Sequence, residues 1–258
     1  MDLCVREAKK EEFDTVSELF FHGFLGVWNH NWFQSLSEPL KSIPPSREMT
    51  SLQSDRMMFY TSMMNATLLV GGKILVGTIQ EDGVDVIVTA MLWTPPKLRF
   101  SIWTPVVLYK SGFINVLYRY GISGFKKVQL LYESNIESML SQTLKNFKPI
   151  DCSYIQLLAT HTKHYGHGYS SKLLTEMMRM HFKQYASPVL LDTATNQAKR
   201  VYLKLGYEEL ASREIAKGET DALGISLKPN ATKEESEQCE ARMYVMAMTK
   251  SHFDEINT

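Results

Sequence analysis

Residues 153–174, SYIQLLATHTKHYGHGYSSKLL, contain the pattern that decides the fold. Ser153 to Thr160 is a compact apolar run of strand length, and a polar loop with two glycines follows it. After the loop, side chains that suit a buried helix face recur at helical spacing, at Leu173, Leu174, Met177, Met178 and His181. The stretch therefore predicts a strand, a glycine-bearing loop and a helix in direct succession.

The loop enters the predicted helix at its N-terminus, where backbone N–H groups lack partners and the helix macrodipole is positive. A phosphate group placed there satisfies both features at once. Gly166 and Gly168 would let a phosphate approach the backbone without meeting a Cβ atom. Basic side chains add local positive charge, namely Lys163, His164, His167 and Lys172. We therefore expect the loop to bind a phosphorylated cofactor.

A second strand and helix follow the first pair. The strand is the apolar run 189–192, and the helix after it ends at Gly206, where a left-handed glycine suits the C′ position. The apolar face of this helix is formed by Ala198, Val201, Tyr202 and Leu205. Further strands are predicted from Tyr207 onward and over residues 242–248.

The N-terminal half predicts the other elements of the sheet and its cover. By residue range, these are a strand at 5–8, helices at 13–24 and 52–64, and a β-hairpin at 73–79 and 85–93. Residues 103–147 are expected to form an insertion of two helices with a break at 121–124. Residues 216–240 are polar and lack a periodic apolar face, so we expect a mobile surface insertion there.

The composition is that of a globular protein. The 258 residues are 44% hydrophobic and 22% charged, which allows one large α/β domain over residues 1–258. Because 28 basic residues balance 28 acidic ones, no overall field would attract nucleic acid or an anionic membrane. Three scattered cysteines, the lack of a signal-peptide pattern and the lack of a long apolar run favour a cytoplasmic protein. The oligomeric state cannot be inferred.

Other interpretations of the loop remain open. Two glycines can simply form a tight turn. The spacing Gly166, Gly168, Ser171 also approximates a dinucleotide fingerprint of the NAD type, with Asp192 near the place of a ribose-binding acid. His161, His164 and His167 suggest a metal site, but they lie on a strand-to-loop path with no helix to align them, so we expect no metal.

Two motifs resemble the GNAT superfamily of N-acetyltransferases. Residues 158–174, with Tyr-Gly-His-Gly-Tyr-Ser at 165–170, look like the loop of that family that binds the pyrophosphate of acyl-CoA. Residues 190–207, with Asn196, Tyr202 and the pair Gly206-Tyr207, resemble its second motif. The helical insertion is most similar to small-molecule acetyltransferases of the antibiotic-inactivating and fungal type.

The resemblance implies a single-domain acyl-CoA N-acyltransferase fold, α/β, with a mixed, largely antiparallel central sheet flanked by helices on both faces. It also implies acetyl-CoA as the cofactor and a small-molecule amine as the acceptor. The positions that match the cofactor-binding motifs are Leu158, Ala159, Thr160, Tyr165, Gly166, His167, Gly168, Tyr169, Ser170 and Asn196. Asn196 could equally be the cap of the short helix that follows it.

The resemblance further assigns Tyr202 as the donor to the leaving thiolate. Relatives often carry a carboxylate base on the strand before the loop, but Tyr154 and Gln156 are the polar residues in this one. His161 leaves the strand next to the expected thioester and is a candidate base or water-positioning residue, although the residue type and position favour a solvated loop histidine. The missing carboxylate motivates an alternative function, that of an inactive CoA-binding regulatory protein on the same fold.

The acceptor pocket is expected between residues 26–64, the strand 85–93 and the insertion 103–147. Its aromatic surface has four candidates, Trp28, Trp32, Trp93 and Trp103, which could equally belong to the core.

Overall fold

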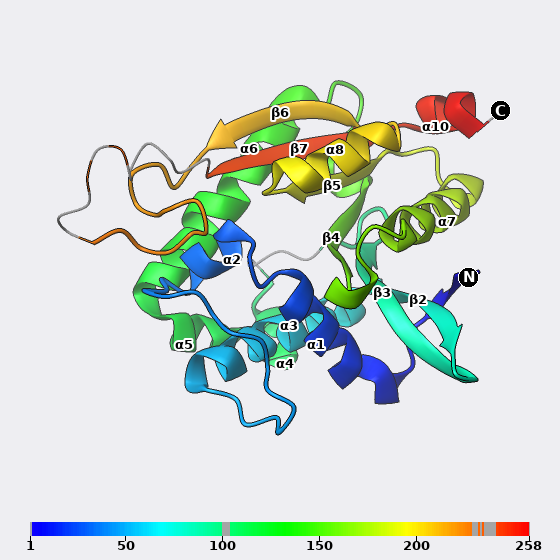
Figure 1. Ribbon diagram of the computed structural model, residues 1–258. Coiled ribbons are helices and arrows are strands. Elements are labelled where there is room, and N and C mark those ends of the chain that lie inside the picture. The colour runs from blue at the N-terminus through cyan, green and yellow to red at the C-terminus, as the bar shows by residue number, and fades with distance from the viewer. Residues whose placement is uncertain (1, 100–103, 229–231, 233, 235–240, 258) are drawn as a thin grey trace.

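The computed structural model describes residues 2–99, 104–228, 232, 234 and 241–257. Within these residues the chain forms one seven-stranded sheet in the order β1-β2-β3-β4-β5-β7-β6 (Figure 1). The strands are β1 (Cys4–Glu7), β2 (Lys73–Glu81), β3 (Val84–Thr94), β4 (Ser153–Thr160), β5 (Val189–Thr193), β6 (Glu208–Glu214) and β7 (Arg242–Met248). Apart from the parallel pair β4–β5, neighbouring strands are antiparallel.

This topology confirms the predicted mixed, largely antiparallel sheet. It also contradicts the dinucleotide-binding alternative, because that fold needs a mostly parallel, doubly wound sheet, and here the parallel pairing extends over three residue pairs.

Helices cover both faces of the sheet, as the alternation of side chains along the strands requires. The helices are α1 (Phe13–Gly23), α2 (Trp28–Phe33), α3 (Ser51–Leu69), α4 (Pro105–Ser111), α5 (Phe113–Phe125), α6 (Ser134–Thr143), α7 (Tyr169–Gln184), α8 (Asn196–Lys204) and α10 (Lys250–Asn257). On one face, Ile74 and Val76 pack in a core with α1–α3, α5 and α6. On the other, Leu75 packs in a core with α7, α8 and α10.

The helical insertion lies within the predicted range but has more helical segments than the two predicted, because α4 precedes α5 and a π-helical segment joins α5 to α6. Gly121 interrupts α5 with non-helical dihedral angles (φ 68°, ψ −174°), in agreement with the expected break. After α5 the chain continues as a π-helical segment, η2 (Lys126–Glu133), before α6. One face of η2 and α6 is apolar and buried. It consists of Tyr132, Ile136, Met139 and Leu140.

The polar segment that starts at residue 216 is packed against α2 over its described part, 216–228. Trp32 Nε1 donates to Glu219 Oε2 (3.0 Å), and Asn31 Nδ2 donates to the carbonyl of Leu223 (2.8 Å). Ala216 and Thr220 are fully buried. These contacts join residues far apart in sequence. The local polarity of the segment predicted a mobile surface insertion, but tertiary contacts hold its described part in place. Most of 229–240, including Cys239, lies outside the described residues.

The close packing of residues 216–228 against α2 requires a glycine at position 224, and this requirement can be tested by its effect on stability. Its φ is +77°, and a Cβ there would lie 1.9 Å from the carbonyl oxygen of Trp28. Gly224→Ala should therefore lower the free energy of unfolding by about 3 kcal/mol or more, from the clash and the backbone strain together.

The matched control is Gly83→Ala, at φ +79° with open space around the new Cβ, which should cost about 1 kcal/mol. Urea denaturation of both variants measures the difference. Equal losses would mean that residues 216–228 do not pack against α2 as described.

Candidate functional site

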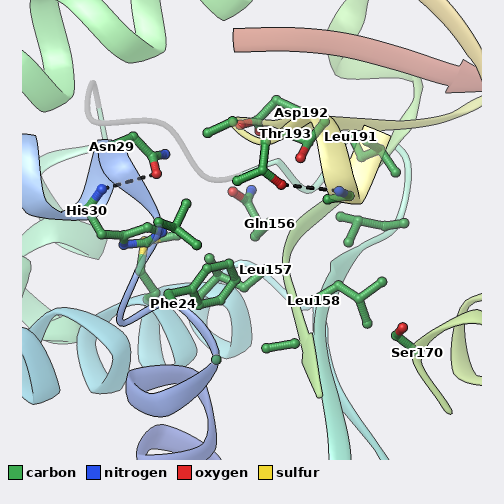
Figure 2. A pocket seen from close by; sticks show the side chains of 18 of the residues that line it. Phe24, Asn29, His30, Gln156, Leu157, Leu158, Ser170, Leu191, Asp192 and Thr193 are labelled. Atoms are coloured by element: carbon green, nitrogen blue, oxygen red, sulfur yellow. Dashed lines mark hydrogen bonds between the residues drawn. The ribbon is translucent and has the colours of Figure 1, made fainter. Parts of the chain in front are cut away.

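The site begins where β4 and β5 separate. The two strands pair over Ser153–Ile155 and Val189–Leu191, and beyond Ile155 β4 continues to Thr160 without a β5 partner. A bulge lies at the same point, because Leu92 pairs with Leu157 and Trp93 with Ile155, which leaves Gln156 opposite no residue of β3. The separation opens the sheet and exposes a backbone edge of β4 to the space beside it. Figure 2 shows Gln156 in this space, with Asp192 and Thr193 across from it.

The glycine loop closes one end of the opening. Gly166 (φ +82°) and Gly168 (φ +72°) adopt left-handed conformations, and a Cβ at either position would meet open space. Helix α7 begins directly after Gly168 without a side-chain cap. Within the described chain, the backbone N–H groups of residues 166–171 have no hydrogen-bond partner, since the first bond of the helix is Lys172 N to the carbonyl of Gly168. Six consecutive donors are therefore available to an anion.

Side chains of the loop leave this array open. His167 turns back onto its own loop, where Nδ1 contacts the carbonyl oxygens of His164 (3.2 Å) and Tyr165 (3.1 Å). Its ring stacks on Tyr169 with 5.5 Å between the ring centroids. Tyr165 reaches across to helix α1, and its hydroxyl donates to the carbonyl of Gly23 at 3.4 Å. These contacts brace the loop, and of the residues with unpaired amides all but His167 line the cavity.

One cavity of about 1580 Å³ joins the loop, the free edge of β4 and the helical insertion. Most of the predicted site residues line it, namely Leu158, Ala159, Thr160, Tyr165, Gly166, Gly168, Tyr169, Ser170 and Tyr202. His161, His167 and Asn196 are not among the lining residues. The volume exceeds that of a single drug-sized ligand site, so the cavity has room for two ligands.

His161 and Asn196 have local partners instead. The Nδ1 atom of His161 accepts the N–H of Lys163 (3.2 Å) and caps a short 3₁₀ turn, while desolvation lowers its pKa. Asn196 Oδ1 accepts the hydroxyl of Tyr244 (2.7 Å). The cap of α8, for which Asn196 was one candidate, is formed by Thr195, whose hydroxyl accepts from Ala198 N (3.2 Å).

Comparison with known proteins agrees with this geometry. A family model described as FR47-like protein matches residues 131–216, which include β4, the loop, α7, β5 and α8. Arylalkylamine N-acetyltransferase 2 from Aedes aegypti shares the fold at 14% identity and a TM-score of 0.56, over 96% of this chain and 99% of that one. Polyamine N-acetyltransferase from Drosophila melanogaster does so at 12% identity and a TM-score of 0.53, over 96% and 100%. No curated protein sequence matches significantly.

The chain therefore has the acyl-CoA N-acyltransferase fold of these N-acetyltransferases, as the resemblance to the GNAT superfamily implied. Its resemblance to the antibiotic-inactivating and fungal type stays a prediction. The family model matches a range that contains both motifs singled out in the sequence, the one around the loop and the one around α8.

Tyr202 of the GNAT motif lies in the cavity wall on α8 and is buried. Burial, together with the nearby charge of Asp192, raises the pKa of Tyr202 well above its ordinary value. The hydroxyl therefore stays protonated at neutral pH and can donate a hydrogen bond.

An acidic side chain, Asp192, lines the cavity, and the sequence analysis had considered it only under the dinucleotide alternative. Asp192 at the end of β5 accepts hydrogen bonds from the hydroxyls of Tyr132 (Oδ2) and Tyr154 (Oδ1), both at 2.6 Å. Burial raises the pKa of Asp192, while the two hydroxyls and the nearby Arg99 guanidinium oppose that rise. A signal for this group exists in the sequence, since Asp192 ends an otherwise apolar strand.

Glu133 and Arg99 extend this acidic group. Both line the cavity, and Arg99 pairs with Glu137 (2.9 Å) and stacks over the ring of Tyr154 (4.1 Å to the centroid). Glu133 is exposed to the open cavity, but the protein atoms around it displace part of its hydration, and this desolvation raises the pKa of Glu133 to about 7 although Arg99 acts in the opposite direction.

The tryptophans predicted to line the acceptor pocket belong to the core. Trp28 Nε1 donates to the carbonyl of Ala194 (2.6 Å), Trp32 bonds Glu219, and Trp93 packs under α7. Trp103 lies outside the described residues. The aromatic surface of the cavity comes from Phe24, Phe33, Phe59, Phe113 and Tyr132. Sequence spacing could not separate these two sets, because aromatic side chains occur both in cores and in pocket walls.

Two further searches of the described residues gave negative results. No three His, Cys, Asp or Glu side chains are grouped so that they could hold a metal ion. In the same ranges, no helix has both the length and the apolarity needed to cross a membrane.

Tyr154→Phe tests the hydrogen bonds to Asp192. The change removes a donor to the Asp192 carboxylate, so the free energy of unfolding should fall by about 1.5–3 kcal/mol. Tyr244→Phe removes a bond to a neutral amide and should cost about 1 kcal/mol. Chemical denaturation compares the two, and a smaller loss for Tyr154→Phe would contradict the charged acceptor.

Proposed function

We propose that this protein is an acetyl-CoA-dependent N-acetyltransferase that moves an acetyl group directly to the amine of a small molecule. The observation that carries the proposal is the open row of backbone donors at residues 166–171, in one cavity with the free edge of β4 and with Tyr202. The names of the structural relatives, an arylalkylamine and a polyamine N-acetyltransferase, support a small amine as the acceptor.

The residues of the loop fit the diphosphate of coenzyme A. Charged phosphate oxygens need several hydrogen-bond donors and a positive potential, and the loop amides together with the N-terminus of α7 supply both. A Cβ at Gly166 or Gly168 would project into open space, which is the space that the phosphates would fill. Acetyl-CoA supplies the acetyl thioester.

Beyond the loop, the unpaired edge of β4 would hold the extended arm of the cofactor. Residues 156–160 have backbone groups that β5 does not satisfy, and an extended ligand can pair with them as a strand would. This pairing directs the thioester toward the bulge at Gln156 and toward Tyr202. Tyr202 would donate its hydroxyl hydrogen to the sulfur as negative charge develops there.

The remaining expectations are part of the same proposal. We propose one acyltransferase domain over residues 1–258, acting in the cytoplasm, where reduced cysteines such as Cys4 and Cys152 are ordinary. Three predicted positions, His161, His167 and Asn196, would act only indirectly, because they do not line the cavity.

Gly168→Val tests the phosphate assignment. The valine side chain would occupy the open space beside the loop amides, so binding of coenzyme A measured by calorimetry should be lost. Gly83→Val is the matched control, because its φ (+79°) and open surroundings are the same but it lies in the β2–β3 turn. Both variants should lose similar stability, and unchanged affinity in Gly168→Val would refute the assignment.

Tyr202→Phe tests the role of the hydroxyl. We expect kcat to fall by about 100-fold, while the Kd for acetyl-CoA changes little, because the hydroxyl acts on charge that forms only during the reaction. Tyr207→Phe is the control, since that buried hydroxyl has no hydrogen-bond partner among the described residues and does not line the cavity. Equal kcat in Tyr202→Phe and wild type would remove Tyr202 from the mechanism.

A thiol-release assay with a panel of primary amines decides between the enzyme and the inactive regulatory protein. Binding of coenzyme A without release of thiol from any amine would favour the regulatory protein, whose motivation is the lack of Asp or Glu on β4.

A further inference from the structure

The helical insertion presents a row of hydrogen-bond acceptors to the cavity. Gln129 and Glu133 on η2 and Glu137 on α6 are spaced four residues apart, and all three line the cavity. Residues at this spacing lie one above the other on successive helical turns. The row thus follows one side of the insertion, and β4 and the loop line the same cavity.

Two members of this row lack partners. Gln129 is only 4% exposed, and its Oε1 atom has no hydrogen-bond partner among the described residues. A buried amide oxygen without a partner is unfavourable, so the position suits a ligand N–H that meets it once the Gln129 side chain turns into the cavity. Glu137 is paired with Arg99, but over the described ranges no ion pair or hydrogen bond reaches the Glu133 carboxylate, which faces the cavity space.

The wall next to this row is apolar. Phe33, Phe59, Phe113 and Val128 line the cavity from α2, α3, α5 and η2. A ligand that satisfies the whole wall therefore has a cationic N–H head and an apolar body. Neutral alcohols fit the apolar part but place no positive charge against Glu133.

We propose that Glu133 and Gln129 bind the acceptor as an ammonium ion with an apolar body, and that the Glu133 carboxylate then takes the proton which the amine must lose before acetyl transfer. This inference rests on the proposed function and deepens it. It replaces His161 as the candidate base, because His161 does not line the cavity.

The step balances as follows. One N–H proton of the ammonium passes to the Glu133 carboxylate and from there to solvent. The freed nitrogen lone pair forms the N–C bond to the acetyl carbonyl carbon, while the C–S bond breaks and its electron pair stays on sulfur. A second N–H proton is released as the amide forms, and the sulfur gains one proton through the Tyr202 hydroxyl. The products are the N-acetyl amide, free coenzyme A and one proton.

The charges around Glu133 suit this role. Arg99 favours its ionised form, while Asp192 and Glu137 favour its protonated form, and Tyr132 and Tyr154 hold Asp192 by their hydroxyls. With a pKa of about 7, the group can release as well as accept a proton near neutrality. The positive charge of an ammonium ion bound beside Glu133 would favour the ionised form of Glu133.

The first experiment is the pH profile of kcat/KM for wild type and Glu133→Gln, with 2-phenylethylamine and acetyl-CoA. In wild type, kcat/KM should rise about tenfold per pH unit and level off near pH 7, as Glu133 ionises. Glu133→Gln should lower the plateau by about 100- to 10,000-fold and remove this bend, and Glu133→Asp should recover part of the rate. Glu176→Gln, on the exposed surface of α7, is the unchanged control.

Two results would overturn the proposal. A wild-type profile that continues to rise past about pH 9 would mean that the neutral amine binds, because free amine then limits the rate. Turnover by Glu133→Gln at the wild-type rate and with the wild-type bend would assign the base elsewhere, while the acetyltransferase function itself would stand.

A second measurement does not depend on turnover. Calorimetry should detect 2-phenylethylamine binding to wild type, with 2-phenylethanol binding at least tenfold weaker, and Glu133→Gln should abolish this preference. In the free protein, Glu133 binds more protons when folded than when unfolded between about pH 4.5 and 7, so the Tm should fall as pH rises through this window and fall less in Glu133→Gln. No preference for the amine together with equal Tm slopes would contradict the cation site, even if coenzyme A binds.

Discussion

The separation of β4 from β5 is the constraint on which the rest of the site depends. Two parallel strands that pair over three residue pairs and then diverge leave one backbone edge without partners inside the protein. The fold tolerates that edge because a cavity lies against it, in which water or a ligand can satisfy it. The bulge at Gln156 marks where the pairing changes, and the glycine loop and α7 continue from the free end of the same strand. Donors from strand, loop and helix therefore face one space.

Charged side chains gather in this cavity, although the overall composition is neutral. The chain is neutral overall, yet Asp192, Glu133, Glu137 and Arg99 line the cavity together. Burial raises the pKa of both Asp192 and Glu133, while hydrogen bonds from two tyrosines and the Arg99 guanidinium keep the ionised forms accessible. The insertion supplies part of this group and the sheet supplies the rest, so the acceptor side of the cavity forms only when the two pack together.

Much of the fold was predictable because its signals are local. The strand 153–160 was placed at its observed bounds, and the left-handed conformations of Gly166, Gly168 and Gly206 agree with the turns and helix ends inferred from them. Predictions were wrong or incomplete where contacts between distant segments decide. The polar segment 216–228 packs on α2, and three of the four tryptophans proposed for the pocket wall are in the core. The cap of α8 also shifted from Asn196 to its neighbour Thr195.

The sequence by itself determined the order of the elements and the left-handed glycines of the loop before α7, because periodicity, glycine conformation and helix N-termini act over a few residues. Only the tertiary structure decided which polar groups meet in the cavity. Asp192 and Tyr132 are 60 residues apart in sequence, and Tyr154 reaches the same carboxylate from another strand. No local pattern encodes such a meeting, because it arises from how a helical insertion packs across a divided sheet.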